Sequence, residues 1–444
     1  MLAFIVLHLT MATDAPASPF EWLSGGLFFG KKTKGIESID SCKDVLSLVT
    51  GIDENLKQIC LGGASAQQQQ QQQQQASSET STENNATSSA TENGETNNNA
   101  DSPEDFLAAR SQRLRFLLSE ERRVTTQQGR GTPAVAAATV QALTEDAFNH
   151  VVPRLLDNLG ILPFESRKHV ASIINYLLIC GLEGSDAYLY QPVMEAFRDY
   201  VQSRFDEIMS SLVKGHDCTM HGGQADCSLH FGSILRSCLR QVALYQELTV
   251  TTDRTQRYVF PFLEKYVHLP NFDVSSDAME TLRVIMTGGG DKHVDEQSQL
   301  AMADIAATFL TRDYDAIWVQ RFNPKLLSDT ANYMTRRCAL QILSTVLLTR
   351  SNYAIMIRYV ADRSNLILVM KLLRDTSPHI TLDAFHVFKV FVANPNKPPE
   401  VIKILQDNSV KLCAYLETLH KDREDADPQF RDEKALIIAT IEGL

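Results

Sequence analysis

Apolar residues recur at helical spacing through most of the chain, and the clearest example lies between residues 382 and 394. Phe385, Phe388 and Val392 fall at positions i, i+3 and i+7, and a second apolar stripe adjoins them. Two adjoining stripes are typical of a helix that is buried over a wide arc. We expect this helix to end near Asn394, because the residue before a proline is driven out of the α region.

Residues 104–444 continue this pattern as a series of amphipathic helices separated by short breaks such as Ser377-Pro378. Alternation typical of β-strands is rare, and no βαβ rhythm appears. Stacked helical units bury their apolar faces only against their neighbours, as in a solenoid. The sequence therefore predicts an all-α, armadillo- or HEAT-like helical-repeat solenoid, although it contains no tetratricopeptide or ankyrin signature.

The N-terminal hundred residues differ in composition from this body. Residues 63–103 contain nine consecutive glutamines, followed by a tract of Ser, Thr, Asn and Glu. Such a segment cannot bury enough apolar surface to offset the entropy lost on ordering, so we expect a disordered insert. Residues 28–62 are expected to form an N-terminal helical segment of the repeat array, and residues 1–27 an unstructured leader.

The chain of 444 residues carries a formal net charge of −12, which disfavours general binding to a phosphate backbone. The charge is uneven, because residues 321–420 contain 13 basic and 7 acidic residues. This basic segment indicates either a surface for an acidic partner or a solvated face, and it keeps a nucleic-acid-binding helical protein as an alternative.

The sequence contains no apolar run long enough to cross a bilayer. Its scattered cysteines fit a reduced, cytoplasmic protein.

Two C-x-x-H pairs form the sharpest local chemical motif. Sulfur and nitrogen ligands two residues apart suit a tetrahedral zinc ion, so the four side chains are a zinc candidate. The alternative is a loop between helices that happens to contain these residues. The candidate ligands are Cys218, His221, Cys227 and His230.

A glycine-rich stretch over residues 25–31 matches the first seven positions of a phosphate-binding loop. Lys32 stands where that motif needs Ser or Thr for magnesium, and no hydrophobic strand precedes it. No other nucleophile or metalloprotease motif is present. An enzyme that depends on zinc or a nucleotide is therefore only an alternative hypothesis.

The C-terminal part resembles a known family. Residues 382–397, LDAFHVFKVFVANPNK, are similar to the C-terminal signature of the calcium-binding-protein-thirty-nine (mouse-protein-twenty-five, Mo25-like) scaffold family. Residues 332–337 and 429–434 resemble two further stretches of that family. The resemblance is strongest over the last third of the chain.

The resemblance implies a curved rod of armadillo-like repeats that acts as a scaffold, with no catalytic activity and no cofactor. Members of the family bind and allosterically activate sterile-twenty-type protein kinases, or bind a related pseudokinase, in signal transduction and cell polarity. We therefore expect a cytoplasmic kinase activator whose partners are such kinases, rather than nucleic acid or a membrane.

One family surface is a pocket for a partner's Trp-Glu-Phe tail, and Arg337, Met370 and Lys411 match its positions. The two cations suit a carboxylate, and the flexible thioether suits an aromatic ring. Ile367 and Asp407 stand where the family has lysines, so the site carries less positive charge here.

A second family surface is the concave face that contacts the kinase domain. Tyr333, Arg350 and Tyr353 match contact positions on it, and Tyr353 replaces a phenylalanine of the family. Without the resemblance, Met370 is consistent with an ordinary core residue, and the arginines are consistent with solvated charges.

Overall fold

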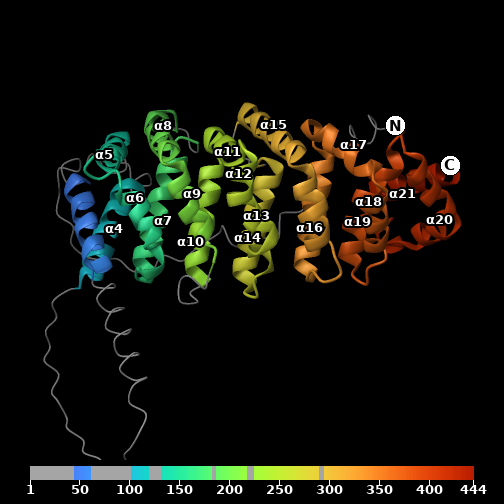
Figure 1. The fold of residues 1–444 in the computed structure, drawn as a ribbon, viewed down its shortest axis with the longest axis horizontal. Helices are drawn as coiled ribbons and strands as arrows, with labels where there is room; N and C mark the ends of the chain where they lie inside the picture. The colour runs from blue at the N-terminus through green and yellow to red at the C-terminus, as the bar shows by residue number, and fades with distance from the viewer. Residues whose placement is uncertain (1–44, 62–101, 120–131, 183–186, 218–224, 290–294) are drawn as a thin grey trace, which may run out of the picture. The chain divides into compact units, whose positions relative to one another are not determined.

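The computed structural model describes residues 45–61, 102–119, 132–182, 187–217, 225–289 and 295–444. Every regular element within these ranges is a helix, which confirms the predicted all-α fold class (Figure 1). The expectations for the leader, for nearly all of the glutamine-rich insert and for the glycine-rich stretch lie outside the described residues.

The helices group into two compact units. Glu37–Leu244 forms the N-terminal unit, and the described part of the C-terminal unit is Tyr245–Leu444, so the boundary falls within α11 (Val242–Thr249). The N-terminal unit contains a helix over residues 45–61, α4 (Pro103–Ser119), α5 (Pro133–Thr144), α6 (Val151–Asp157), η2 (Leu159–Ile161), α7 (Phe164–Ile179), α8 (Ala187–Ser203), α9 (Phe205–Lys214) and α10 (Ala225–Leu239).

One layer of the N-terminal unit consists of α4, α7 and α10, which lie side by side, while α5 packs on α8 and α6 on α9 (Figure 1). A buried carboxylate joins the helix over residues 45–61 to α6. Asp53 is 2% exposed, and its Oδ1 lies 3.0 Å from Arg154 Nη1 and 3.0 Å from His150 Nε2. The first described helix is therefore tied into the repeat array by charge as well as by apolar packing.

The C-terminal unit is longer and includes short 3₁₀ and π segments, labelled η. After α11 it contains α12 (Thr252–Arg254), η4 (Thr255–Val259), α13 (Phe260–Glu264), η5 (Tyr266–His268), α14 (Phe272–Thr287), α15 (Glu296–Arg312), η6 (Asp315–Leu326), α16 (Tyr333–Leu348), η7 (Arg350–Asn352), α17 (Tyr353–Ala361), α18 (Arg363–Leu372), α19 (Pro378–Ala393), α20 (Pro399–Thr418), η8 (Lys421–Arg423) and α21 (Pro428–Glu442).

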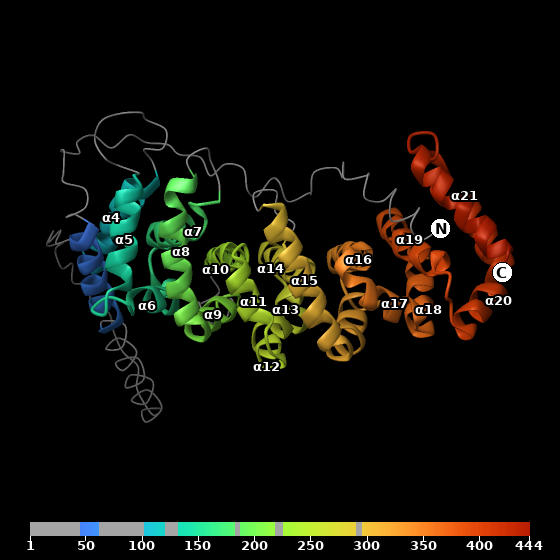
Figure 2. The same cartoon turned by 90° about the horizontal axis from the view of Figure 1, so that it is seen from above.

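Within this unit, α14 packs on α16, α16 on α19, and α19 on α21 (Figures 1 and 2). The starts of these four helices, at residues 272, 333, 378 and 428, are unevenly spaced along the chain. The connections between them differ in length and content, which explains why no regular repeat is visible in the sequence.

The helix predicted most strongly from its apolar pattern is α19. Phe385, Phe388 and Val392 are each 0% exposed, and the helix ends at Ala393 with Asn394 as its C-cap. The predicted wide buried arc and the predicted stop are both confirmed. Burying one helix face so completely contributes about 2 kcal/mol per large side chain relative to an exposed position.

Aromatic side chains join η6, α17 and α19 into one core. The π-helical segment η6 places Trp318 against Phe322, with ring centroids 4.8 Å apart. Trp318 also meets Tyr359 edge-on at 5.9 Å, and Tyr359 meets Phe391 at 6.1 Å. Edge-to-face pairs at these distances add to the free energy gained from burial alone.

Glycines follow α14 at the point where the chain turns toward α15. Gly288 is the C-cap of α14 in the left-handed region, with φ of 74°, and a Cβ there would lie 2.6 Å from the Met302 carbonyl oxygen. Both facts require glycine, so this stretch ends a helix and allows α15 to approach closely.

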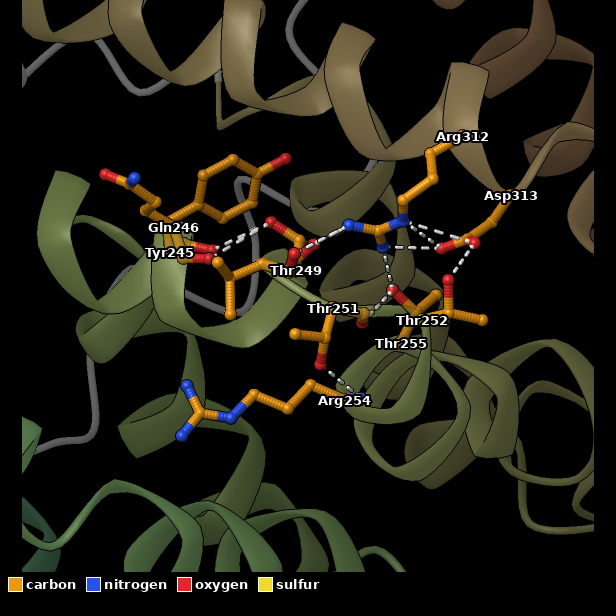
Figure 3. A network of polar contacts seen from close by, with 10 residues as sticks. Tyr245, Gln246, Thr249, Thr251, Thr252, Arg254, Thr255, Arg312 and Asp313 are labelled. Carbon is orange, nitrogen blue, oxygen red and sulfur yellow. Dashed lines mark hydrogen bonds and ion pairs between the residues drawn. The ribbon is translucent and has the colours of Figure 1, made fainter.

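The end of α15 is fixed by a polar network around Arg312 and Asp313 (Figure 3). Arg312 Nη1 donates to the carbonyl oxygens of Thr249 at 3.0 Å and Val250 at 2.8 Å, and Arg312 Nη2 lies 2.6 Å from Asp313 Oδ2. Thr252 Oγ1 donates to Asp313 Oδ1 at 2.7 Å. Burial raises the pKa of the Asp313 carboxyl, but the hydrogen bonds from Arg312 and Thr252 outweigh burial and lower the pKa below its ordinary value.

Ion pairs also connect helices that are distant in sequence within the C-terminal unit. Each joins a basic residue of the segment 321–420 to an acidic residue on another helix or loop. These pairs are Arg321–Glu264, Arg336–Asp375, Arg337–Asp383, Arg358–Asp315, Arg363–Glu400 and Lys389–Glu433. Three of the six acids lie outside residues 321–420, so the charge counted over that stretch leaves out some of the acidic partners of its basic residues.

Candidate functional site

The candidate tail site draws on α18 and α20, which run in the same direction. Near their first residues, Arg363 Nε of α18 lies 3.6 Å from Glu400 Oε2 of α20. Near the other end, the Tyr415 hydroxyl donates to the carbonyl oxygen of Leu373, the C-cap of α18. Two contacts in the same order along both helices fix their parallel arrangement.

Met370 and Lys411 each lie about one turn before the contact between Leu373 and Tyr415. Met370 is half-buried, and Lys411 is exposed. Side chains on a helix lean toward its N-terminus, so both extend over the turn that precedes them. The two candidate residues therefore flank one point of contact between α18 and α20.

Ile367 and Asp407 lie about one further turn toward the starts of α18 and α20. Ile367 is 41% exposed, and Asp407 is also exposed. An exposed apolar residue and an exposed carboxylate thus stand beside Met370 and Lys411. This end of the surface is less basic than the family pattern implies.

Arg337 comes from the first turns of α16, where the Asn332 side chain caps the helix by accepting from Thr335 N at 2.8 Å. The neighbouring Arg336 pairs with Asp375, which follows directly after the end of α18. The first turns of α16 and the end of α18 are thereby held together. Arg337, Met370 and Lys411 come from three helices that these contacts connect.

The partner of Arg337 is Asp383 of α19. Arg337 Nε lies 3.5 Å from Asp383 Oδ2, and Gln341 Nε2 donates to the same oxygen over a long 3.4 Å. Burial raises the pKa of the Asp383 carboxyl above its ordinary value, and the positive charge of Arg337 opposes this only in part. This loosely satisfied pair contrasts with the compact network at Arg312.

Asp383 was not among the residues singled out from the sequence. A usable signal was present, because Asp383 and Lys389 are the only fully charged side chains within the otherwise apolar α19. A charged residue on a buried helix needs a partner to offset its desolvation. The sequence pattern could have marked Asp383 as paired, although it could not have named Arg337 as the partner.

The residues expected to contact a kinase domain are not gathered at one point. Tyr333 begins α16, whereas Arg350 and Tyr353 follow its other end, and the 16 residues of α16 span about 24 Å. All three are exposed, Tyr353 at 59%. They fit an extended contact surface along α16 and its flanks rather than a compact site.

The turn that presents Arg350 and Tyr353 is built by a buried amide. Asn352 is 2% exposed, and its Nδ2 donates to the Val346 carbonyl oxygen at 2.9 Å. Ser351 Oγ donates to Asp304 Oδ1 of α15. These bonds hold η7 against two helices and leave its flanking side chains toward solvent.

The zinc candidate is only partly described. Cys227 and His230 lie on α10, where Cys227 is fully buried and His230 lies beside the Phe164 ring, with centroids 6.4 Å apart. Cys218 and His221 lie outside the described residues, so the zinc set stays a prediction. Among the residues with assigned positions, no three His, Cys, Asp or Glu side chains are grouped as metal ligands.

None of the described helices is both long enough and apolar enough to span a membrane.

Comparison with known proteins gives consistent matches. A family model described as Mo25-like matches residues 65–444. The human protein named calcium-binding protein 39-like is 34% identical over 307 residues, which cover 69% of this chain and 80% of the human protein. MO25-like protein 2 of Caenorhabditis elegans is 35% identical over 69% of this chain and 79% of its own length. The degreening-related gene dee76 protein of Auxenochlorella protothecoides is 36% identical over 66% of this chain and 78% of its own length.

Proposed function

Because this chain belongs to the Mo25-like family, whose members are scaffold-type proteins, we propose that it binds and activates a sterile-twenty-type protein kinase or a related pseudokinase without catalysing a reaction itself. The proposal has two parts, a tail site that anchors the partner and a wider surface that contacts the kinase domain.

The observation that carries the proposal is the combination of residue types around the end of α18. Met370 offers a polarisable, adaptable surface for an aromatic ring. Arg337 and Lys411 come from two further helices connected to α18 and supply positive charge for carboxylates. This chemistry suits a short peptide that combines an aromatic residue with an acidic one.

The two substitutions at Ile367 and Asp407 refine the expected ligand. Replacing two cations with an apolar and an acidic side chain removes attraction for additional acidic residues of the tail. The preferred tail therefore has its acidic groups close to Arg337 and Lys411, and an apolar residue beside Ile367.

The kinase domain is proposed to contact Tyr333, Arg350 and Tyr353. Binding to the active arrangement of the domain more tightly than to the inactive one shifts the population toward the active state. A tail anchored at the same time raises the effective concentration of the domain at this surface. Neither the contact with the tail nor the contact with the kinase domain therefore needs a high affinity by itself.

The two parts can be tested separately. A fluorescein-labelled peptide ending in Trp-Glu-Phe is titrated with the full chain and followed by anisotropy. The double variant Arg337→Ala/Met370→Ala should bind at least about tenfold more weakly, because one charge-assisted contact and one apolar contact are lost. The variant Arg350→Ala/Tyr353→Ala should bind the peptide normally but activate a bound kinase less.

Lys411→Ala and Lys403→Ala form a matched pair for the same titration, because both lysines are exposed on α20. Only Lys411→Ala should weaken peptide binding. Failure of the wild-type chain to bind the peptide and to pull down any sterile-twenty-type kinase would contradict the proposed function.

A further inference from the structure

Arg337 is only partly satisfied by the protein. Its Nε is buried without a hydrogen bond and lies 3.5 Å from Asp383 Oδ2, and within the described part of the chain its two Nη groups have no partner. Its side chain is 27% exposed, so the guanidinium reaches the surface. One edge of the guanidinium therefore faces a protein carboxylate, and the two terminal nitrogens are available to a ligand.

The adjacent Arg336 also has a buried Nε without a hydrogen bond, but it differs at its terminal nitrogens. Arg336 uses Nη1 to pair with Asp375, whose other oxygen accepts from Ser377 N at 2.9 Å. Asp375 therefore holds the loop between α18 and α19 as well as the arginine. Of the two neighbouring arginines, Arg336 joins parts of the fold and Arg337 keeps its terminal nitrogens unoccupied.

We propose that Asp383 is a positioning residue of the tail site, which holds the Arg337 guanidinium by its Nε edge so that both Nη groups face a carboxylate of the partner's tail. The inference rests on the proposed function, because it assigns a role within the same site. It goes beyond that function by naming a residue that does not touch the ligand but determines how tightly the ligand is held.

Physical reasons support this arrangement. A bidentate arginine–carboxylate pair requires the planar guanidinium in one orientation, and a long flexible side chain loses entropy when it adopts it. A carboxylate behind the guanidinium fixes that orientation before the ligand arrives, which reduces the cost at the moment of binding. Asp383 can do so because it lies on the rigid, buried α19.

The groups around Asp383 act on its carboxyl in opposite directions. It faces Arg337, Cys338 and Gln341 from α16 and lies one turn from His379 on α19. Burial raises the pKa of the Asp383 carboxyl, and the positive charge of Arg337 offsets this only in part. Groups whose pKa is shifted by burial and by a specific charged neighbour are enriched at functional sites, which supports the role that the geometry of the pair gives Asp383.

The test is a double-mutant cycle on the full chain, with the labelled Trp-Glu-Phe peptide as probe. Asp383→Asn should weaken binding by about tenfold, because the guanidinium loses the charge that orients it before the ligand arrives. In the Arg337→Ala background the same change should have no further effect, because Asp383 acts through Arg337. Asp383→Glu should recover part of the affinity.

Asp315→Asn is the control, since it removes a carboxylate from an exposed arginine–aspartate pair outside the site and should show no coupling to Arg337→Ala in peptide binding. If Asp383→Asn binds as well as the wild type or more tightly, while Arg337→Ala loses binding, the positioning role is wrong and the proposed function stands. If the wild-type chain does not bind the peptide at all, the proposed function fails and the positioning role fails with it.

Discussion

Arg312–Asp313 at the end of α15 and Arg337–Asp383 between α16 and α19 are both arginine–aspartate pairs in the C-terminal unit. Their arginine side chains are similarly exposed, at 31% and 27%. Arg312 has carbonyl, hydroxyl and carboxylate acceptors for its nitrogens, whereas Arg337 has one long contact. The pKa of Asp313 is lowered and that of Asp383 is raised.

The difference separates a pair that stabilises the fold from the pair that we propose takes part in binding. The two arginines are nearly equally exposed, but only Arg312 has a complete set of hydrogen bonds. A fully satisfied polar network makes a fold rigid. Three comparisons of variants test this distinction, and they are described from the largest expected effect to the smallest.

Arg312→Ala should lower the free energy of unfolding by about 3 kcal/mol, because it leaves the buried carboxylate of Asp313 without its cation. Arg337→Ala should cost less than about 1 kcal/mol, since its contact is long and part-exposed. In a Trp22→Phe background Trp318 is the only tryptophan of the chain, so its fluorescence during urea unfolding reports on this unit. If Arg312→Ala and Arg337→Ala lowered the free energy of unfolding by the same amount, the two arginines would not differ in their contribution to stability.

Asp313→Asn should lower the free energy of unfolding by about 2 kcal/mol at pH 7, the size of a hydrogen bond to a charged group. The pKa of Asp313 is lower in the folded chain than in the unfolded one, so its stabilisation is present above the unfolded value of about 3.9 and is lost as the pH falls through the folded value. The difference in the free energy of unfolding between the variant and the wild type should therefore disappear at acidic pH.

The matched control for this pH series is Asp315→Asn, which removes a carboxylate from an exposed ion pair with Arg358. It should cost less than about 1 kcal/mol at pH 7. If the loss in the free energy of unfolding caused by Asp313→Asn stayed constant from pH 7 to pH 3, the charge of Asp313 would not stabilise the network.

Asp383→Asn should have the smallest effect on stability and the opposite sign, a gain of less than about 1 kcal/mol at pH 7. The raised folded pKa means that the ionised carboxyl disfavours folding, with the full penalty above the folded pKa. The penalty decreases as the pH falls below that pKa and is gone below the unfolded value of about 3.9. The measurement is the same urea series in the Trp22→Phe background. A loss comparable to that of Asp313→Asn would place Asp383 among the structural residues.

The helical class and the limits of α19 could be predicted because they depend on local pattern. Phe385, Phe388 and Val392 mark a buried face, and Asn394-Pro395 marks its end. The tail-site residues were found through resemblance to a family, not through pattern. Without the resemblance, the spacing of Met370 is that of an ordinary core residue.

The pairs that give the site its character could not be predicted. Arg337 and Asp383 are separated in sequence by two intervening helices, α17 and α18, and no local spacing relates them. The segment η6 is π-helical, so it has a different number of residues per turn from an α-helix. The α-helical spacing used to assign buried faces does not apply to it. The charge count over residues 321–420 could not include Glu264, Asp315 and Glu433, which pair with basic residues of that segment from outside it.

The ion pairs between distant elements have a consequence for how the chain reaches its fold. Proteins built from similar helical repeats can misfold by stacking a repeat on the wrong neighbour. Lys389 is 1% exposed and meets Glu433 at 2.7 Å, so shifting α21 to another helix would leave a buried ammonium without an anion. Arg358 and Asp315 constrain η6 and α17 in a similar, weaker way. A misassembled chain would lose these pairs, so they favour the observed order of the helices over a shifted one.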